Sequence, residues 1–470
     1  MECSFYIHAA IGRKVDQTLI APTRDEIDWV GAQFDRVNNI RFKRPPRLDE
    51  PEWDLAFRAI LRTLDPTSCT GLGEFSKYGT IGQALGWDGL RFREVQNVAK
   101  LRECVRSRIR VLERCIPDKY RSKSNAITDI DQPHEELFKE AEASAASEGS
   151  SGIPYTTDGI KLFVKDEPHK LQKIKEGRMR LISAFSLVDQ MVDRMLFYPF
   201  FGAEVRRPMS VTSKAGWAPI PAGYQRLLYE FPEGKSLAVD KSSWDWSMPA
   251  WVLGNYFDAK MRQCTNADWE WAYLVAHRFM TLYGPGARFV MPDGLVWKQK
   301  RVGVMKSGSL LTLSINSAAQ FFQHALAWRR MGKTSDPPRI WTMGDDTLTL
   351  MEDSDINDYH EHLSKTGCVL KICERSRDFA GFLVHGDSIS EASVTPLYED
   401  KHKFMIKYVK PELEEQVMMA FTLLYALNPP DWLKQVLERT EVQLGLKQRL
   451  WAKGIIRLKM LDFVPSCFRY

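Results

Sequence analysis

Apolar residues recur along this chain with two different periods, and each period predicts a different kind of element. In the segment 310–331 they lie three or four positions apart, which predicts a helix with one apolar stripe. The stripe consists of Leu311, Ile315, Ala319, Phe322 and Leu326. Segments with helical character are also found at 55–64, 95–115, 417–427, 432–438 and 448–461.

Short runs rich in β-branched and aromatic residues predict strands. The runs 339–343 and 347–351 flank a turn at Gly344, and glycine permits the backbone angles of a tight turn, so this region is predicted to be a hairpin. A third short run, 236–239, predicts another strand. The stretch 141–152 is rich in Ala, Ser and Gly, which predicts a flexible linker or a surface loop.

Acidic residues stand at the ends of these predicted strands. Asp345 and Asp346 lie at the hairpin tip, and Asp240 ends the run 236–239. A carboxylate at the end of a buried strand is costly unless it is paired or binds a metal, and Mg²⁺ prefers oxygen ligands of this kind. We therefore expect Asp240 and Asp345 to share a pair of Mg²⁺ ions, with Asp346 in support, as phosphoryl transfer to a hydroxyl requires. An ordinary acidic surface turn is the alternative for the hairpin tip.

Polar residues surround the start of the predicted helix at 310–331. Gly308, directly after Ser307, allows the backbone to approach nucleic acid closely. Thr312 and Asn316 are four residues apart and share one helix face, away from the apolar stripe. We expect Asn316 to hydrogen-bond Asp245 or a ribose 2′-hydroxyl; a solvated or core-satisfied amide is the alternative. A cap of the helix that follows is the alternative for Asp245, and the two roles are compatible.

Basic residues are concentrated between Lys161 and Arg180, where seven Lys or Arg stand against three Asp or Glu. Because the whole chain has a net charge of only +5, this segment accounts for nearly all of the excess. Such a density of cations suits a triphosphate or a phosphate backbone; a solvated charged face is the alternative. Interleaved apolar residues predict an ordered, partly packed segment, and they are Phe163, Val164, Leu171, Ile174 and Leu181.

Composition narrows the class of protein. The 470 residues are 44% hydrophobic and 27% charged, which indicates a globular chain. The eight cysteines form no Cys-x-x-Cys pair or other zinc spacing, so reduced thiols in a cytosolic setting are the simplest interpretation. Met1–Ile20 lacks the apolar core of a signal peptide, and no apolar run has the length of a membrane span, so we expect no direct membrane insertion.

Taken in order, these motifs resemble those of the RNA-dependent RNA polymerases of positive-strand RNA viruses, closest to the sobemovirus-like (solemovirus) group. The resemblance rests on Asp240 and Asp245 in DKSSWDWS, on the Ser-Gly-x-x-x-Thr-x-x-x-Asn pattern at 307–316, and on Gly-Asp-Asp at 344–346. The basic block KLFVKDEPHKLQKIKEGRMRLI resembles the fingertip motif of this family, and SLVDQMVDRMLF after it also fits.

This resemblance implies an α+β protein with the right-hand polymerase fold. In that fold a palm with an antiparallel sheet and flanking helices carries the metal site, between fingers and a helical thumb. The implied boundaries are 1–235 for fingers with an N-terminal extension (fingertip block 161–182), 236–257 and 306–390 for the palm, 258–305 for a fingers insertion, and 391–470 for the thumb.

The resemblance also implies roles for individual residues. Asp240 and Asp345, supported by Asp346, match the family's metal ligands. The nucleotide-binding set comprises Asp245, Ser307, Gly308, Thr312 and Asn316 around the ribose, and Lys165, Lys173, Arg178 and Arg180 around the triphosphate. Lys371 falls near the position of the proposed general acid that protonates the leaving pyrophosphate. Lys365 is a competitor for that role, and a solvated lysine is the alternative.

Two further segments resemble RNA-contacting motifs. The segment 67–71 (TSCTG) is similar to the template-entry motif, but Thr70 stands where that motif usually has Pro, so an ordinary polar turn is an equal alternative. The segment 379–386 (FAGFLVHG) looks like the hairpin that grips the primer end, and a plain strand pair is its alternative. The residues expected to contact template or primer are Thr67, Ser68, Gly71 and Phe379.

The family implies Mg²⁺-dependent RNA synthesis from NTPs on an RNA template, with Mn²⁺ as a substitute ion. Expected partners are template and nascent RNA, a genome-linked protein primer and other viral replication proteins, in host-cytoplasm complexes that those proteins recruit to membranes. Two alternatives stay open. A reverse transcriptase shares the carboxylates but usually has a bulky aromatic residue where this chain offers Asp245 and Asn316. A catalytically silent RNA-binding or capsid-type protein would keep the basic block and need no carboxylates.

Overall fold

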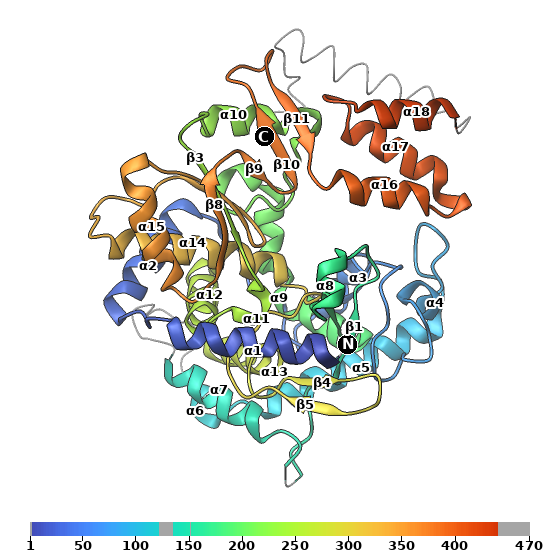
Figure 1. Ribbon diagram of the computed structural model, residues 1–470. Helices are drawn as coiled ribbons and strands as arrows, with labels where there is room; N and C mark the ends of the chain where they lie inside the picture. Colours follow the sequence, from blue (N-terminus) through green and yellow to red (C-terminus); the bar gives the residue numbers. More distant parts are fainter. Residues whose placement is uncertain (1, 122–134, 151, 440–470) are drawn as a thin grey trace.

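The computed structural model describes residues 2–121, 135–150 and 152–439, so the predicted helix at 448–461 lies outside the described residues. Helices and mostly antiparallel strands are mixed along the chain, which confirms the predicted α+β class (Figure 1). The predicted helices before and after the strand-rich part are also confirmed. They correspond to α3 (Trp53–Leu61), α5 (Val95–Arg114), α17 (Glu414–Leu424) and α18 (Asp431–Arg439).

A four-stranded antiparallel sheet lies at the centre of the molecule. Its order is β6-β7-β3-β8, so β3 is flanked on both sides. The bounds are β3 (Ser236–Lys241), β6 (Ile340–Met343), β7 (Asp346–Leu350) and β8 (Leu370–Arg375). Leu237 and Val239 of β3 are almost completely buried, because helices cover the sheet. The β6–β7 pair confirms the hairpin predicted around Gly344.

Helix α14 (Thr312–Arg330) is the main support of this sheet. It contacts β6 and the helices α2 (Arg24–Val37), α12 (Ala250–Gln263) and α15 (Ile356–Ser364). The sequence predicted one apolar stripe on this helix, but every residue from Ser314 to Trp328 is buried. The polar residues on its other faces are tolerated because they find partners: Lys241 Nζ donates to Gln320 Oε1 and to Gln323 Oε1, the latter at 2.6 Å.

A second sheet, with order β2-β1-β4-β5, brings together segments that are far apart in the sequence. Strand β1 pairs antiparallel with β2 and parallel with β4, and the bounds are β1 (Ile160–Val164), β2 (Leu181–Ala184), β4 (Arg288–Val290) and β5 (Val296–Lys298). The short helix α8 (Leu171–Lys175) lies between β1 and β2. Strands from either side of β3 in the sequence therefore share one sheet; the domain boundaries given above remain predictions.

The prediction of a flexible linker at 141–152 is wrong for its first half. Residues Glu135–Ser147 form helix α7, which packs along α13 (Trp269–Tyr283). Ala141 and Ala145 are fully buried in this contact. Alanine is the strongest helix former and its small side chain lets two helices approach closely, so an Ala-rich, Ser-rich stretch was mistaken for a loop.

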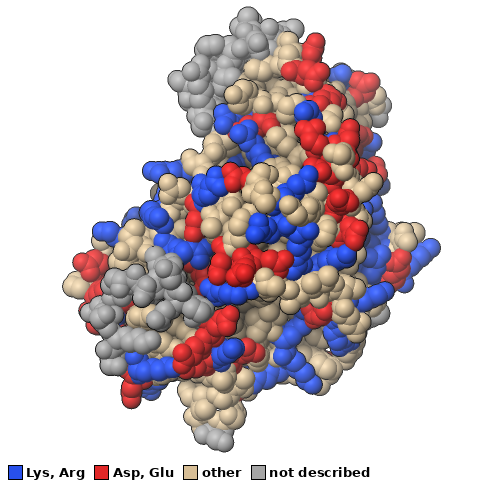
Figure 2. All heavy atoms as spheres, turned by 90° about the vertical axis from the view of Figure 1, so that its left-hand side faces the viewer, with Lys and Arg blue, Asp and Glu red and all other residues tan. Residues whose placement is uncertain are grey.

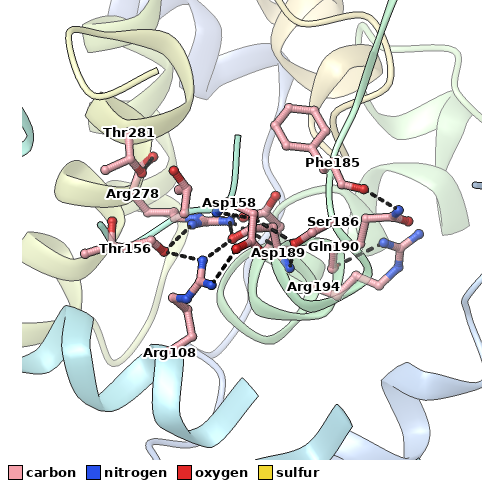
Figure 3. A network of polar contacts seen from close by, with 12 residues as sticks. Arg108, Thr156, Asp158, Phe185, Ser186, Asp189, Gln190, Arg194, Arg278 and Thr281 are labelled. Atoms are coloured by element: carbon pink, nitrogen blue, oxygen red, sulfur yellow. Dashed lines mark hydrogen bonds and ion pairs between the residues drawn. The ribbon is translucent and has the colours of Figure 1, made fainter. Parts of the chain in front are cut away.

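Buried charges join the helices beneath the second sheet (Figure 3). The Arg278 guanidinium of α13 bonds Asp193 at 2.7 Å and Asp189 at 3.1 Å, both on α9 (Leu187–Arg206). Arg108 of α5 bonds Asp189 and Asp158, each at 3.1 Å. Burial raises the pKa of Asp193 to about 6 despite the neighbouring Arg278. This network fixes three helices against the loop that enters β1.

The C-terminal part contains a small sheet and three helices. The sheet has the order β11-β10-β9, with bounds β9 (Asp378–Phe379), β10 (Phe382–His385) and β11 (Ser393–Pro396). Helices α16 (Glu399–Lys407), α17 and α18 follow it and lie across from α4 (Ile81–Leu85) and α8 in Figure 1. The N-terminal helix α1 (Glu2–Thr18) contacts α11 (Trp244–Ser247).

The outer surface is of mixed charge. On the side that carries α2 and α15, Lys and Arg stand among Asp and Glu without one dominant sign (Figure 2). None of the helices in the described part of the chain is both long and apolar enough to cross a membrane.

Replacing Arg278 by Met should lower the free energy of unfolding by about 3–5 kcal/mol, because Asp193 would stay buried without its ion-pair partner and Asp189 would keep only Arg108. Arg36→Met is the control, since the Arg36–Asp336 pair is more than half exposed and its loss should cost at most about 1 kcal/mol. Urea denaturation followed by circular dichroism measures both. Equal losses in the two variants would show that the buried network does not hold these helices.

Candidate active site

The acidic residues predicted from the sequence meet at one end of the central sheet. Val239 pairs with Thr347, so the next residue on β3, Asp240, lies beside the first residue of β7, Asp346. Asp345 occupies the β6–β7 turn after Gly344, whose φ of 67° is in the left-handed region. The Gly344 amide donates to Ser317 Oγ of α14 at 3.0 Å, which fixes the turn.

Electrostatic coupling between these carboxylates shows that they are close together. Burial is the main cause that raises the pKa of Asp345, and the charges of Asp245 and Asp240 raise it further. Burial, then Asp345 and Asp240, raises the pKa of Asp346 to about 7. Like charges in a partly buried site disfavour one another's ionised form. The cluster therefore carries more negative charge than the surrounding protein compensates.

Lys371 reaches into the carboxylate cluster. Lys371 Nζ, on β8, donates to Asp240 Oδ2, and this hydrogen bond raises the pKa of the lysine. Its competitor Lys365 instead pairs with Glu361 on α15 at 2.6 Å. Of the two lysines considered for the general acid, the structure brings only Lys371 to the carboxylates; its chemical role remains a prediction.

The donor set suits a hard divalent cation. Asp240, Asp345 and Asp346 offer carboxylate oxygens, which Mg²⁺ prefers, and a cation would relieve their repulsion. As the side chains stand, no group of three or more His, Cys, Asp or Glu residues within the described ranges has the arrangement of a formed metal site. Lys371 supplies a positive charge at Asp240.

Asp245 forms a second polar cluster beside the first. It accepts hydrogen bonds from Ser307 Oγ and from Asn316 Nδ2, the latter at 3.2 Å, which confirms the predicted Asp245–Asn316 contact. Burial raises the pKa of Asp245, and both hydrogen bonds oppose that shift. The alternative of a helix cap does not hold, because Asp245 lies inside α11, whose N-cap is Ser243 with a φ of 52°.

Two neighbours of this cluster have mainly structural contacts. Thr312 Oγ1 donates to the carbonyls of Lys306 and Ser309, both at 2.9 Å, and so begins α14. Gly308 has a φ of 113°, and a Cβ there would lie 2.4 Å from Ser183 O of β2. Gly308 therefore lies close to the protein backbone of β2; whether it also approaches nucleic acid remains a prediction.

The basic block faces the carboxylates from the β1–β2 hairpin. Arg180 lowers the pKa of Asp345 and of Asp245 through its charge, which opposes the larger effect of burial. Burial lowers the pKa of Lys173, and the nearby Lys371 lowers it further. Among the described residues Lys173 has no acidic partner, whereas Arg178 pairs with Glu176. This arrangement leaves a cation free for an anionic ligand.

The prediction of a partly packed basic segment holds only for its strands. Leu181 of β2 is buried, but Leu171 and Ile174 of α8 are 67% and 49% exposed. Helix α8 forms the connection between β1 and β2 and lies on the side of the hairpin that faces α16 (Figure 1). Apolar residues placed between basic residues therefore indicate packing in strands β1 and β2, but not in α8.

The segment 67–71 is held as a tight polar turn. Asp65 accepts hydrogen bonds from the Thr67 and Ser68 hydroxyls at 2.7 and 3.1 Å. A Cβ at Gly71, whose φ is 65°, would lie 2.3 Å from Phe185 O, so the turn is pressed against the start of α9. Whether Thr67, Ser68 and Gly71 contact a template remains a prediction.

The Phe379 side chain does not have the surface that primer contact requires. It is 1% exposed and packs against Trp217 and Trp341, with ring centroids 5.6 and 5.9 Å away. The β9–β10 hairpin is present, with its turn at Ala380-Gly381. Phe379 therefore anchors this hairpin in the core; the prediction that it touches the primer is corrected.

Three residues near the site were missed by the sequence reasoning. Burial and then Asp240 raise the pKa of Asp378 to about 6, and burial and then Asp346 raise the pKa of Tyr398. His8 of α1 stacks on Trp246, next to Asp245, with ring centroids 5.5 Å apart. Asp378 directly precedes the hairpin motif, which was a usable signal. Tyr398 and His8 reach the site only through long-range packing.

The chain is similar in sequence to a family of viral proteins and to individual members of it. The profile of the family described as viral RNA-dependent RNA polymerase matches residues 112–379. The chain is 33% identical over 233 residues to the RNA-directed RNA polymerase of Mushroom bacilliform virus, covering 48% of this chain and 54% of that one. It is 36% identical over 197 residues to the replicase polyprotein P2AB of Cocksfoot mottle virus, covering 41% and 20%. The matches thus span about half of one relative and a fifth of the other.

A solved structure supports the fold. The Sicinivirus 3Dpol RNA dependent RNA polymerase superposes with a TM-score of 0.57 at 15% identity, covering 96% of this chain and 86% of that chain. This likeness confirms the predicted right-hand architecture.

In the absence of divalent cations, the free energy of unfolding should change with pH because of the Asp346 carboxyl group. Its pKa is about 7 in the folded state against 3.8 ordinarily, so its stabilising contribution is complete below about pH 4 and is lost as pH rises through 7. Asp346→Asn should remove this loss, which is on the order of 2–4 kcal/mol by pH 8. Urea denaturation in EDTA from pH 5 to 8 tests it. Parallel pH profiles of the two proteins would contradict the repulsion between the carboxylates.

Proposed function

Because this chain belongs to the viral RNA-dependent RNA polymerase family, whose profile matches residues 112–379, we propose that it synthesises RNA on an RNA template. In the proposed reaction the 3′-hydroxyl of the nascent RNA attacks the α-phosphate of a bound NTP and pyrophosphate leaves. The observation that carries this proposal is the junction of β3 with the β6–β7 turn, which brings Asp240 and Asp345 together. The product in a virus would be copies of a positive-strand genome.

Asp240 and Asp345, with Asp346 in support, would hold the Mg²⁺ ions that such chemistry needs, and Mn²⁺ would serve as a substitute. When bound, these ions supply activation of the attacking hydroxyl and neutralisation of phosphate charge. The repulsion that raises the pKa values of Asp345 and Asp346, although Lys371 pairs with Asp240, supports this assignment. It also argues against a silent RNA-binding protein, which has no use for a costly acidic cluster.

The basic block would hold the triphosphate. Lys173 has no acidic partner within the described residues. Burial, and then the charge of the nearby Lys371, lowers its pKa. Arg178 and Arg180 add two guanidinium groups, and each of them can bind two phosphate oxygens at once. Lys371 carries its proton because Asp240 stabilises the charged form, and we assign its Nζ proton to the leaving pyrophosphate.

The cluster around Asp245 would select the sugar. Asn316 Nδ2 donates to Asp245, while Asn316 Oδ1 is buried and has no hydrogen-bond partner among the described residues. A buried acceptor without a partner is costly, and a 2′-hydroxyl is a donor that would satisfy it. This feature favours ribonucleotides and argues against a reverse transcriptase.

The proposed partners are template and nascent RNA, NTPs and other proteins of a viral replication complex. The names of the relatives, replicase polyproteins of plant viruses among them, support this part of the proposal. A genome-linked protein primer belongs to the same proposal, and so does a location in cytoplasmic complexes that other proteins bring to membranes.

Asp345→Asn should reduce nucleotide incorporation by at least about a thousandfold, because it removes a charge that the metal ions require. The fold should persist, since the substitution relieves repulsion. Asp336→Asn is the control, because this exposed Asp pairs only with Arg36. Primer extension on an RNA template with Mg²⁺ measures both variants, and normal extension by Asp345→Asn would refute the site.

Wild-type protein should prefer ATP over dATP, and Asn316→Ala should lower that preference about ten- to a hundredfold, because the acceptor for the 2′-hydroxyl is lost. The ratio of kcat/KM for the two nucleotides is the measurement. Leu313→Ala, on the same helix but 41% exposed, should leave the ratio unchanged. A wild-type preference for dATP would contradict RNA synthesis itself.

A further inference from the structure

One carboxylate joins the basic block to the C-terminal helices. Glu167 follows β1, and its oxygens lie 3.0 Å from Lys165 Nζ, 3.7 Å from Arg180 Nη1 and 2.8 Å from Lys401 Nζ. Lys401 belongs to α16 and is 234 positions away in the sequence. Glu167 is therefore shared by two residues of its own hairpin and one residue of a distant helix.

The backbone holds Glu167 in this position. The Lys165 amide donates to Arg180 O at 2.9 Å and closes the hairpin, and the Glu167 amide donates to Lys165 O at 2.9 Å. Its side chain is only 13% exposed, whereas those of Lys165 and Lys401 are both 39% exposed. In Figure 1, α16 lies across from α8 and the hairpin that carries it.

The Glu167 carboxyl group is ionised at neutral pH. Burial alone would raise its pKa, but hydrogen bonds from Lys401 and Lys165 outweigh burial and hold the pKa at about 2. Among the ion pairs of the described residues, Glu167–Lys401 is the only one that links the segment 399–439 to the rest of the chain. The two parts are also joined by a hydrogen bond from Asn428 Nδ2 to Thr395 Oγ1 at 2.8 Å and by packing of Leu427, so Glu167 is the point at which the basic block takes part in the contact.

Two of the three cations at Glu167 are residues that we assign to the triphosphate. A triphosphate and Glu167 would therefore compete for Lys165 and Arg180. We propose that Glu167 is a positioning residue that couples triphosphate binding to the contact with α16. When the triphosphate binds Lys165 and Arg180, Lys401 no longer shares the Glu167 carboxylate with those two cations. The identity of the ligand as a nucleoside triphosphate rests on the proposed function.

This coupling is reciprocal. If the triphosphate tightens the Glu167–Lys401 contact, then that contact must favour triphosphate binding by the same factor. The consequence reaches the carboxylates, because Tyr398, three residues before Lys401, lies within the electrostatic influence of Asp346 and Asp240. Fixing the start of α16 would therefore fix a residue at the edge of the site.

Variants at the two ends of the contact test this inference. Lys401→Met should weaken binding of inorganic tripolyphosphate and of ATP about three- to tenfold, because Glu167 then retains Lys165 and Arg180 more strongly. Glu167→Gln removes the competitor and should not weaken binding. The double variant should behave like Glu167→Gln. Lys403→Met is the matched control, since Lys403 pairs with Glu399 on its own helix at 2.6 Å. Isothermal titration calorimetry measures all four.

Amide hydrogen exchange measures the response of α16 separately from triphosphate binding. Tripolyphosphate should slow amide hydrogen exchange in 399–407 in the wild type and in Lys403→Met, but not in Lys401→Met. In primer extension, Lys401→Met should raise the KM for ATP and leave kcat within about twofold. Unchanged tripolyphosphate affinity in Lys401→Met, or a loss that persists in the double variant, would overturn the coupling. If the proposed function alone is wrong, the wild type will not extend RNA, yet the binding and exchange effects will remain.

Discussion

The repulsion among Asp240, Asp345 and Asp346 is the constraint on which the rest of the structure depends. Three acidic groups at the end of a covered sheet are unfavourable unless something compensates them, and burial with like charge raises the pKa of Asp346 to about 7. The sheet keeps them together because β3 is held on both sides, by β7 and by β8. Among the described residues, Lys371 is the lysine that forms an ion pair with these carboxylates.

The elements around the three carboxylates hold them in place against this repulsion. Helix α14 is buried over nearly its whole length and supplies Ser317 to the Gly344 turn and Asn316 to Asp245. The buried ammonium of Lys241 lies directly beyond Asp240 and is held by two glutamine side chains of the same helix. The energetic cost of the acidic cluster is thus offset by packing elsewhere, as is common at functional sites.

Much of the fold and of the site was predictable, since short-range signals specify it. A strand ending in Asp240 and a glycine turn with two acidic residues are local patterns, and β-pairing brings them together. The failures have a common cause. Phe379 was expected at the primer but is buried against Trp217 and Trp341, and the 141–152 segment was expected to be flexible but contributes to α7. Both outcomes depend on partners distant in sequence, which no local pattern specifies.

The central claim is that the carboxylates of Asp240 and Asp345 bind divalent cations jointly. Electron paramagnetic resonance of free Mn²⁺, titrated into the protein without nucleotide, tests it most directly. The account predicts that Asp240→Asn and Asp345→Asn each lower the affinity for Mn²⁺ by at least about tenfold, while Asp336→Asn leaves it unchanged. Equal Mn²⁺ binding by the wild type and Asp345→Asn would contradict the account.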